Sequence, residues 1–282
     1  MLTRDIVAKL ADPHPVVWAP LKKADMVSLG SLGELVLKKR LRRFFINRFK
    51  PLHVWGTGFL KYGAPTNSLF LKIHALRGKN SLTRLSQQGR DIALGDPGLL
   101  CSRLFPQAVS KRQKTILAIP HLHDKNYQTW VDAITALYPE YTVEVWSCDK
   151  PVEPTLKAIA SAAMVVSSAM HPLITAHSYR TPCLWVELDD GTHAGKRYKF
   201  EDYYSVTGLP AQSACLGALQ QHEENPEQLR QELDRQLLTS QMMPDKLESL
   251  QNDLIDAFGR MAEDMGLDTL YSDNEKLSSH AA

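Results

Sequence analysis

A histidine follows a pair of serines at the point where an apolar stretch gives way to a helical pattern. Met164–Ser167 predict a buried strand, and His171 and Pro172 stand where the next helix should begin, since proline suits an early helical position. An imidazole beside the exposed N–H groups of a helix start can handle an anion or transfer a proton. Together with Ser168, His171 therefore predicts a reactive site, although a histidine that only caps or packs would leave the same pattern.

Two further imidazoles follow another short apolar stretch. The residues Thr115–Ile119 predict a strand, and His121 and His123 come directly after it in the segment 119–124, IPHLHD. Both rings could face a cleft at the end of that strand. A metal site would need a third ligand that the spacing does not supply, so no metal is expected.

The candidate anion-binding cations are an arginine and a lysine in other segments. Arg77 follows the predicted strand Leu69–His74, and a guanidinium there could hold a carboxylate or phosphate with two hydrogen bonds. Ser81 is expected to cap the helix that comes next. Lys199 lies in an aromatic and acidic segment, YKFEDYY, and could reach a phosphate. A surface arginine and a lysine that covers tyrosines are the structural alternatives.

Glycine-rich turns accompany these segments. Gly56 and Gly58 follow the predicted strand Leu52–Trp55 and allow close backbone approach, but a simple strand-to-loop turn would look the same. The segment 95–98, GDPG, is typical of a turn that Asp96 holds in place.

The elements that must position these residues alternate along the chain. Short β-branched stretches followed by amphipathic ones predict βαβ units around buried parallel sheets, and thus an α/β fold. The predicted strands are Asp25–Leu29, Leu52–Trp55, Leu69–His74, Thr115–Ile119, Thr142–Trp146, Met164–Ser167 and Cys183–Glu187. The predicted helices between them are Lys125–Leu137, Pro154–Ala162 and His171–Tyr179.

The last part of the chain is predicted to be helical. Pro244 suits a helix start, and one apolar face recurs at spacings of three and four residues, formed by Leu247, Leu250, Leu254, Phe258 and Met261. We expect an N-terminal α/β domain at 1–105, a Rossmann-like domain at 112–225, C-terminal helices at 226–265 and a flexible tail at 272–282.

Composition limits the class of protein. The chain has 282 residues, 44% of them hydrophobic, which suffices for two modest cores. Its net charge of +2 does not indicate a nucleic-acid-binding protein. The four cysteines form no CxxC pair, so we expect buried free thiols rather than zinc ligands or disulfides. No stretch is long and apolar enough for a membrane span or a signal peptide, which predicts a cytoplasmic protein.

One segment, Lys38–Lys50, interleaves seven basic residues with aromatic and aliphatic ones. Three interpretations stay open: a surface helix with solvated charges and a buried aromatic face, peripheral contact with an anionic membrane, and contact with a nucleic-acid backbone.

Taken together, the segments resemble the bacterial polysaccharide pyruvyl transferase family. Each motif alone is weak, but their order over about 150 residues is difficult to obtain by chance. The matching segments are VWGTGF (54–59), ALRGKNS (75–81), GDPGLL (95–100), IPHLHD (119–124), SSAMHPLITAHSYRTPCLWVELDD (167–190) and KFEDYY (199–204).

The resemblance implies a fold and an activity. It implies two Rossmann-like domains in a glycosyltransferase-B-like arrangement, with phosphoenolpyruvate as donor and no metal or organic cofactor. The acceptor would be a sugar of an exopolysaccharide, capsule or cell-wall precursor, often lipid-linked, and the product a pyruvate ketal. The catalytic residue would be His171, and the donor-binding residues would be Arg77, Ser168, His121 and Lys199. No acceptor-binding residue is implied.

The chain also departs from the family pattern. Ala169 stands where many members have arginine, and Pro172 where many have glycine. The first residues align just inside the family's first helix, so we expect an incomplete first βα unit. A nucleotide-sugar glycosyltransferase of similar fold and a non-catalytic protein that binds glycans or a synthase partner are therefore the alternatives.

Overall fold

The computed structural model describes residues 2–86, 91–106, 113–187, 197–212, 214–215, 226–241 and 244–269. The chain divides into two compact units. Unit 1 comprises Met1–Leu100, Tyr198–Thr207 and Glu248–Ala282, and unit 2 comprises Cys101–Arg197 and Gly208–Leu247. The tail predicted at 272–282 lies outside the described residues, and the predicted domain bounds stay predictions.

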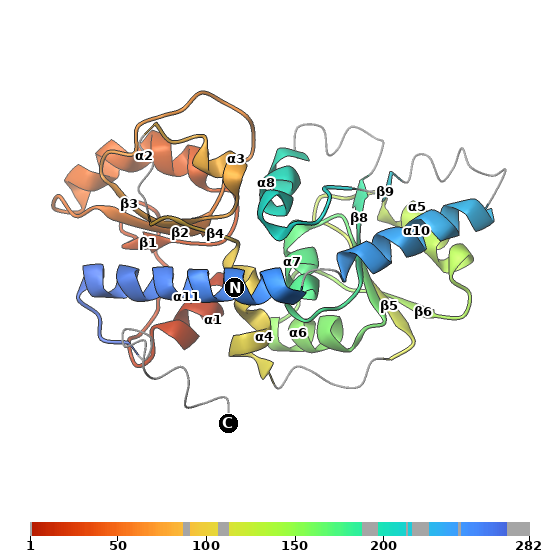
Figure 1. The fold of residues 1–282 in the computed structure, drawn as a ribbon. Helices are drawn as coiled ribbons and strands as arrows, with labels where there is room; N and C mark the ends of the chain where they lie inside the picture. The colour runs from red at the N-terminus through yellow and green to blue at the C-terminus, as the bar shows by residue number, and fades with distance from the viewer. Residues whose placement is uncertain are drawn as a thin grey trace. The chain divides into compact units, whose positions relative to one another are not determined.

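Unit 1 contains a four-stranded sheet in the order β1-β2-β3-β4, in which every neighbouring pair is parallel (Figure 1). Its strands are β1 (Met26–Val27), β2 (Leu52–Thr57), β3 (Leu71–Leu76) and β4 (Ala93–Leu94). Its helical elements are α1 (Leu2–Leu10), α2 (Gly33–Ile46), α3 (Lys79–Leu82), the 3₁₀ helix η1 (Pro97–Leu100), α8 (Arg197–Thr207) and α11 (Pro244–Met265). The residues of α8 from Tyr198 onward and those of α11 from Glu248 onward belong to this unit.

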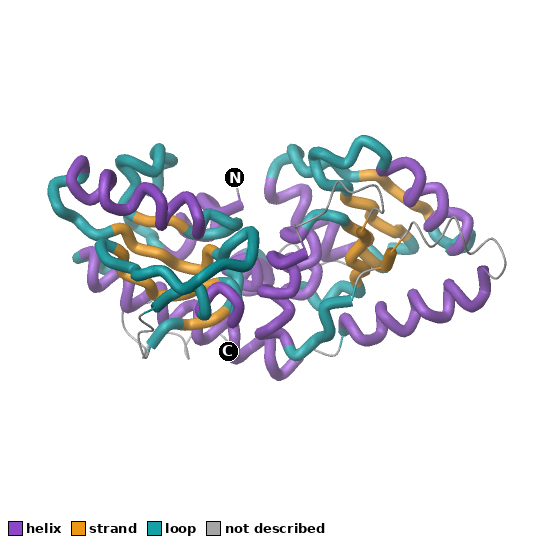
Figure 2. Tube along the Cα trace, turned by 90° about the horizontal axis from the view of Figure 1, so that it is seen from above, coloured by secondary structure: helices purple, strands orange, loops and turns teal. Residues whose placement is uncertain are grey.

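Helices cover both faces of this sheet. Successive residues of a strand point to opposite sides, so the apolar residues of β2 need a packing partner on each face. On one side, Val54 of β2 packs in a core with Val36 and Leu37 of α2. On the other side, the Trp55 indole donates a hydrogen bond to the Leu254 carbonyl at 3.0 Å. Figure 1 shows α2 on one face of the sheet and the helix that contains Leu254, α11, on the other. Figure 2 shows the strands between the helices.

The helix that receives the Trp55 hydrogen bond is α11 (Pro244–Met265), and it matches the prediction in start and orientation. All five residues of the predicted apolar face, Leu247, Leu250, Leu254, Phe258 and Met261, are buried. The Phe258 ring lies 5.1 Å from the Trp55 ring, so the face that the periodicity indicated is the face that packs.

Unit 2 contains a second parallel sheet, with the strand order β6-β5-β7-β8-β9. Its strands are β5 (Thr115–Ile119), β6 (Thr142–Val145), β7 (Met164–Ser167), β8 (Cys183–Glu187) and β9 (Ala214–Cys215). Its helices are α4 (Cys101–Leu104), α5 (Tyr127–Leu137), α6 (Val152–Ser161), α7 (Met170–Ser178) and α10 (Pro226–Ser240). The predicted α/β class is confirmed, and three strands have the predicted bounds.

The inner strands β5, β7 and β8 of unit 2 are buried, as their continuous apolar sequences require, whereas the outer strand β6 is largely exposed. Ile116 and Val166 pack in one core with Trp130 of α5 and Leu237 of α10, while α7 lies against β7 and β8. The polar loops lie at the ends of these buried strands, and a ligand can bind there.

Two sequence expectations concern other properties of the chain. Among the described cysteine side chains, Cys101 and Cys183 are buried free thiols as predicted, but Cys148 is exposed, so the prediction is wrong there. None of the described helices has both the length and the apolar character that a membrane span requires.

A buried histidine pair in unit 1 was not anticipated from the sequence. His53 Nδ1 and His74 Nε2 lie 3.0 Å apart, and the rings stack at 5.2 Å. Burial lowers the pKa of both imidazoles, that of His74 to about 4. Ligand atoms of the two histidines and of Asp264 lie within 4.8 Å of one another, but Lys72 pairs with Asp264 at 3.0 Å and adds a positive charge there.

This pair predicts a loss of stability in acid. Below pH 6.5 the unfolded chain takes up a proton that folded His74 does not bind until about pH 4, so protons favour unfolding in that window. Between pH 7 and pH 5 His74 should lower the free energy of unfolding by about 2 kcal/mol.

The measurement is urea unfolding at both pH values for the wild type and for His74→Gln. The substitution should flatten the pH dependence, whereas His123→Gln, which replaces an exposed histidine of unit 2, should leave it unchanged. Equal pH dependence in the wild type and His74→Gln would contradict the assignment.

Candidate functional site

The site in unit 2 lies where two neighbouring strands end. β5 is central, with β6 on one side and β7 on the other, so the connections that follow β5 and β7 leave the sheet in opposite directions. In open parallel sheets, ligands bind outside the carboxyl ends of the strands at such a switch point. The last paired residues of β5 and β7 are Ile119 and Ser167, which places the segments 120–124 and 168–171 there.

Hydrogen bonds join these two segments. Ser168 Oγ accepts from the His121 backbone N–H at 3.0 Å and donates to the carboxylate of Asp124. The same carboxylate accepts from the His121 N–H at 3.2 Å. The hydroxyl of Ser167 donates to the Ile119 carbonyl at 2.6 Å. The structure thus brings together His121 and Ser168, two of the predicted donor-binding residues, and it adds Asp124 as the acceptor that joins them.

His171 is the second residue of α7, at the end of the segment that follows β7. It is half-buried, whereas Ser168 is fully buried and Asp124 nearly so. The residue that precedes the helix, Ala169, makes no side-chain hydrogen bond to the first turn. The start of α7 combines the positive end of a helix dipole with an imidazole, an arrangement suited to an anion and to proton transfer.

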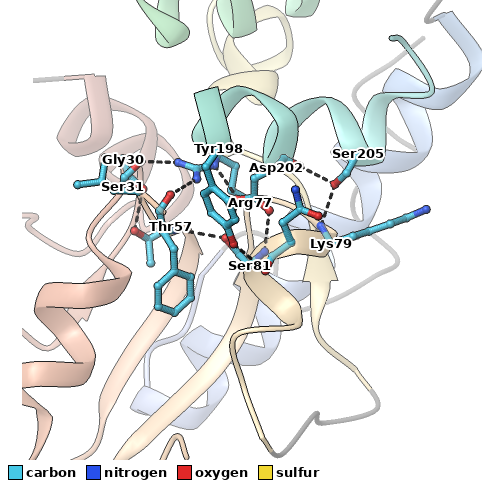
Figure 3. Close-up of polar contacts among 12 residues, drawn as sticks. Gly30, Ser31, Thr57, Arg77, Lys79, Ser81, Tyr198, Asp202 and Ser205 are labelled. Carbon is cyan, nitrogen blue, oxygen red and sulfur yellow. Dashed lines mark hydrogen bonds and ion pairs between the residues drawn. The ribbon is translucent and has the colours of Figure 1, made fainter. Parts of the chain in front are cut away.

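Arg77 belongs to unit 1 and is fully buried. Its guanidinium donates through Nε to Asp202 at 2.9 Å, through Nη1 to the Ser31 hydroxyl at 2.6 Å and through Nη2 to the Phe59 carbonyl at 2.6 Å (Figure 3). All three of its nitrogens have protein partners. Arg77 therefore positions the surrounding segments in this structure, and its contact with a donor stays a prediction.

The carboxylate that pairs with Arg77 also fixes α8. Asp202 accepts from the backbone N–H of Ser81 at 2.7 Å and from its hydroxyl at 2.6 Å. A Cβ on Gly78 would lie 1.8 Å from the Asp202 carbonyl, and one on Gly58 would lie 2.4 Å from the Arg77 guanidinium. Both glycines are needed because their neighbours occupy that space. Ser81 lies inside α3, whose N-cap is Gly78, so the predicted capping role of Ser81 is wrong.

Two other sequence candidates lie in unit 1. Lys199, on α8, is buried, with Nζ 5.0 Å from the centre of the Phe200 ring. Asp96 accepts from the Gly98 N–H at 2.9 Å, which confirms its predicted role in the turn. Burial raises the pKa of Asp96 to about 7. The candidates thus divide between the units: Arg77 and Lys199 in unit 1, and His121, Ser168 and His171 in unit 2.

Two important residues lie inside the matching motifs, but the sequence alone predicted no role for them. Asp124 closes the segment IPHLHD, and Asp202 lies inside KFEDYY. A buried arginine requires a carboxylate, so an acid among the aromatic residues of α8 was the available signal for Asp202. The 125 residues that separate it from Arg77 left the partner unidentified.

Comparison with known proteins bears on these segments. The family model described as polysaccharide pyruvyl transferase matches residues 3–190, about two thirds of the chain. An uncharacterized protein of Acanthamoeba polyphaga mimivirus is 29% identical over 162 residues, which are 55% of this chain and 55% of that protein. The chain thus spans about half the length of the curated relative it matches.

The buried ion pair predicts a large and specific effect of removing its acid. Asp202→Ala leaves the Arg77 guanidinium buried without a carboxylate, which should lower the free energy of unfolding by about 3–5 kcal/mol. Urea unfolding measures this. Glu201→Ala is the matched control, because its carboxylate accepts from the exposed Tyr62 hydroxyl, and it should cost about 1 kcal/mol or less. Similar losses in both variants would contradict the structural role of the pair.

Proposed function

Because the chain belongs to the polysaccharide pyruvyl transferase family, we propose that it transfers the pyruvyl group of phosphoenolpyruvate to a sugar as a ketal. The acceptor is a sugar of a polysaccharide or of its precursor, and a lipid-linked precursor fits the proposal. We further propose that the two α/β units form a glycosyltransferase-B-like pair and that the reaction takes place in the cytoplasm.

The observation that carries the proposal is that three predicted residues, His121, Ser168 and His171, lie on the segments that follow the carboxyl ends of β5 and β7. The parallel pairing of β5 with β7 and the Ser168–Asp124 hydrogen bond put His121 and His171 on adjacent segments at the switch point. Phosphoenolpyruvate carries a phosphate and a carboxylate. The start of α7, where the positive end of the helix dipole lies beside the His171 imidazole, favours such a doubly anionic ligand.

The reaction must balance protons as well as bonds. The methylene carbon of phosphoenolpyruvate gains a proton and becomes the methyl group, while a first sugar hydroxyl attacks the neighbouring carbon. The bond from that carbon to the phosphate oxygen breaks, and a second hydroxyl closes the ketal. Of the two hydroxyl protons, one matches the proton gained by carbon and the other leaves with phosphate.

Each residue of the site has a role in this scheme. His171 donates or accepts a proton, or stabilises the departing phosphate, because it is the half-buried titratable group at the helix start. His121 contacts the donor from the adjacent segment. Ser168 and Asp124 act as positioning residues, since their polar atoms bond to one another and to the His121 backbone. For Arg77 and Lys199 we keep the predicted role of neutralising donor charge, which requires their buried side chains to become accessible.

Calorimetric titration of phosphoenolpyruvate into the full chain tests the proposal without knowledge of the acceptor. The wild type should bind saturably, and His171→Gln should raise the dissociation constant about tenfold, since a hydrogen bond to a charged group contributes about 1.5 kcal/mol or more. His14→Gln, which replaces a histidine bonded to the Asp268 carbonyl in unit 1, should bind as the wild type does.

Uridine diphosphate serves as the contrasting ligand. Binding of this nucleotide without binding of phosphoenolpyruvate would contradict the proposal and favour a nucleotide-sugar glycosyltransferase. Binding of neither ligand, in the presence of sugar acceptors, would favour a non-catalytic protein.

A further inference from the structure

Helix α2 presents a solvent-facing side that the proposed reaction does not use. Its inner side is held firmly: Val36 and Leu37 are buried in the core of unit 1, and the Arg43 guanidinium donates to the Ala24 carbonyl. The predicted alternative of a buried aromatic face is wrong for Phe45 and Phe49, which expose 59% and 64% of their surfaces.

We call the exposed side the α2 patch. It consists of the exposed residues Lys38, Lys39, Leu41, Arg42, Phe45, Ile46, Arg48, Phe49 and Lys50. Leu41 and Ile46 expose about half of their surfaces, 52% and 48%. Single exposed apolar residues are ordinary, but four within nine positions form a feature that needs explanation.

The backbone holds the end of this patch in a defined conformation. Arg48 and Phe49 both have positive φ, 52° and 64°, which is uncommon for residues other than glycine. The Phe49 N–H donates to the Phe44 carbonyl at 2.8 Å, and the Phe49 ring lies 5.6 Å from the rings of both Phe44 and Phe45. The aromatic side chains are thus gathered by the fold rather than left on a loose loop.

The charge of the patch has one sign. Residues 35–50 contain no acid and seven basic residues. None of the five exposed cations, Lys38, Lys39, Arg42, Arg48 and Lys50, forms a salt bridge to an acid within the part of the chain that the structure describes. The rest of the chain offsets this charge, since the net charge is only +2.

We propose that the α2 patch docks unit 1 on the surface of an anionic lipid bilayer. Phenylalanine, leucine and isoleucine side chains can enter the boundary between headgroups and acyl chains, while lysine and arginine stay at the phosphate level. A nucleic-acid backbone would match the cations but would leave Leu41 and Ile46 without an apolar partner. The combination of charge and exposed apolar surface therefore favours the bilayer.

Because the proposal does not depend on pyruvyl transfer, binding rather than turnover tests it. The full chain is sedimented with vesicles of phosphatidylcholine alone and with vesicles that also contain phosphatidylserine. We expect binding to the anionic vesicles, weakened by added salt, and little binding to the neutral ones.

Two pairs of substitutions separate the charged from the apolar contribution. Lys38→Gln with Lys39→Gln should lower partitioning to anionic vesicles about 25-fold, since each cation near such a surface contributes about a fivefold factor. Phe45→Ser with Phe49→Ser should lower it about tenfold or more. All four positions are exposed, so unfolding temperatures should stay close to that of the wild type.

Matched controls remove the same groups elsewhere. Lys157→Gln with Lys246→Gln neutralises two exposed helical lysines, and Leu238→Ser removes an apolar side chain that is 64% exposed. These variants should partition as the wild type does. Equal partitioning of patch and control variants, no binding to anionic vesicles, or tighter binding to an oligonucleotide than to vesicles would each overturn the proposal.

Discussion

The parallel pairing of β5 with β7 is the constraint on which the proposed site depends. It sets Ile119 beside Ser167, so the two segments that follow must leave the sheet at neighbouring points. The buried Asp124 carboxylate then joins them by accepting from Ser168 and from the His121 backbone. Ser168 and Asp124 are themselves buried, and the hydrogen bonds between them and to the His121 backbone offset the cost of removing these polar groups from water. The position of His171 follows from the same pairing.

A second constraint acts inside unit 1, where the Arg77 guanidinium has no exposed surface. A charge in that position must be matched by a carboxylate and by further acceptors. Asp202 supplies the charge, and Ser31 and Phe59 supply oxygens. This requirement explains why a segment distant in sequence, Tyr198–Thr207, belongs to unit 1. The burial of Arg77 alone requires this arrangement, without any ligand, so the segment around Arg77 can look like a binding motif for a structural reason.

The sequence predicted the bounds of β5, β7 and β8, because continuous β-branched stretches such as Thr115–Ile119 have few alternatives once both faces are buried. It did not predict the two-residue strands β4 and β9, which are too short to show a pattern. It also predicted the packed face of α11 from spacing alone. It could not predict the partner of Arg77 or the His53–His74 pair, since these contacts join residues whose separation carries no periodic signal. Spacing places a side chain on an element, but burial and pairing depend on how the elements pack. The exposed aromatics of α2 illustrate the same limit, because composition alone left three interpretations open.

The most direct test of the central claim is a crystal structure of the full chain grown with phosphoenolpyruvate. The account predicts donor density at the carboxyl ends of β5 and β7, with its phosphate or carboxylate at the start of α7 and within hydrogen-bonding distance of His171. Donor density elsewhere, with the segments 120–124 and 168–171 unoccupied, would contradict the account.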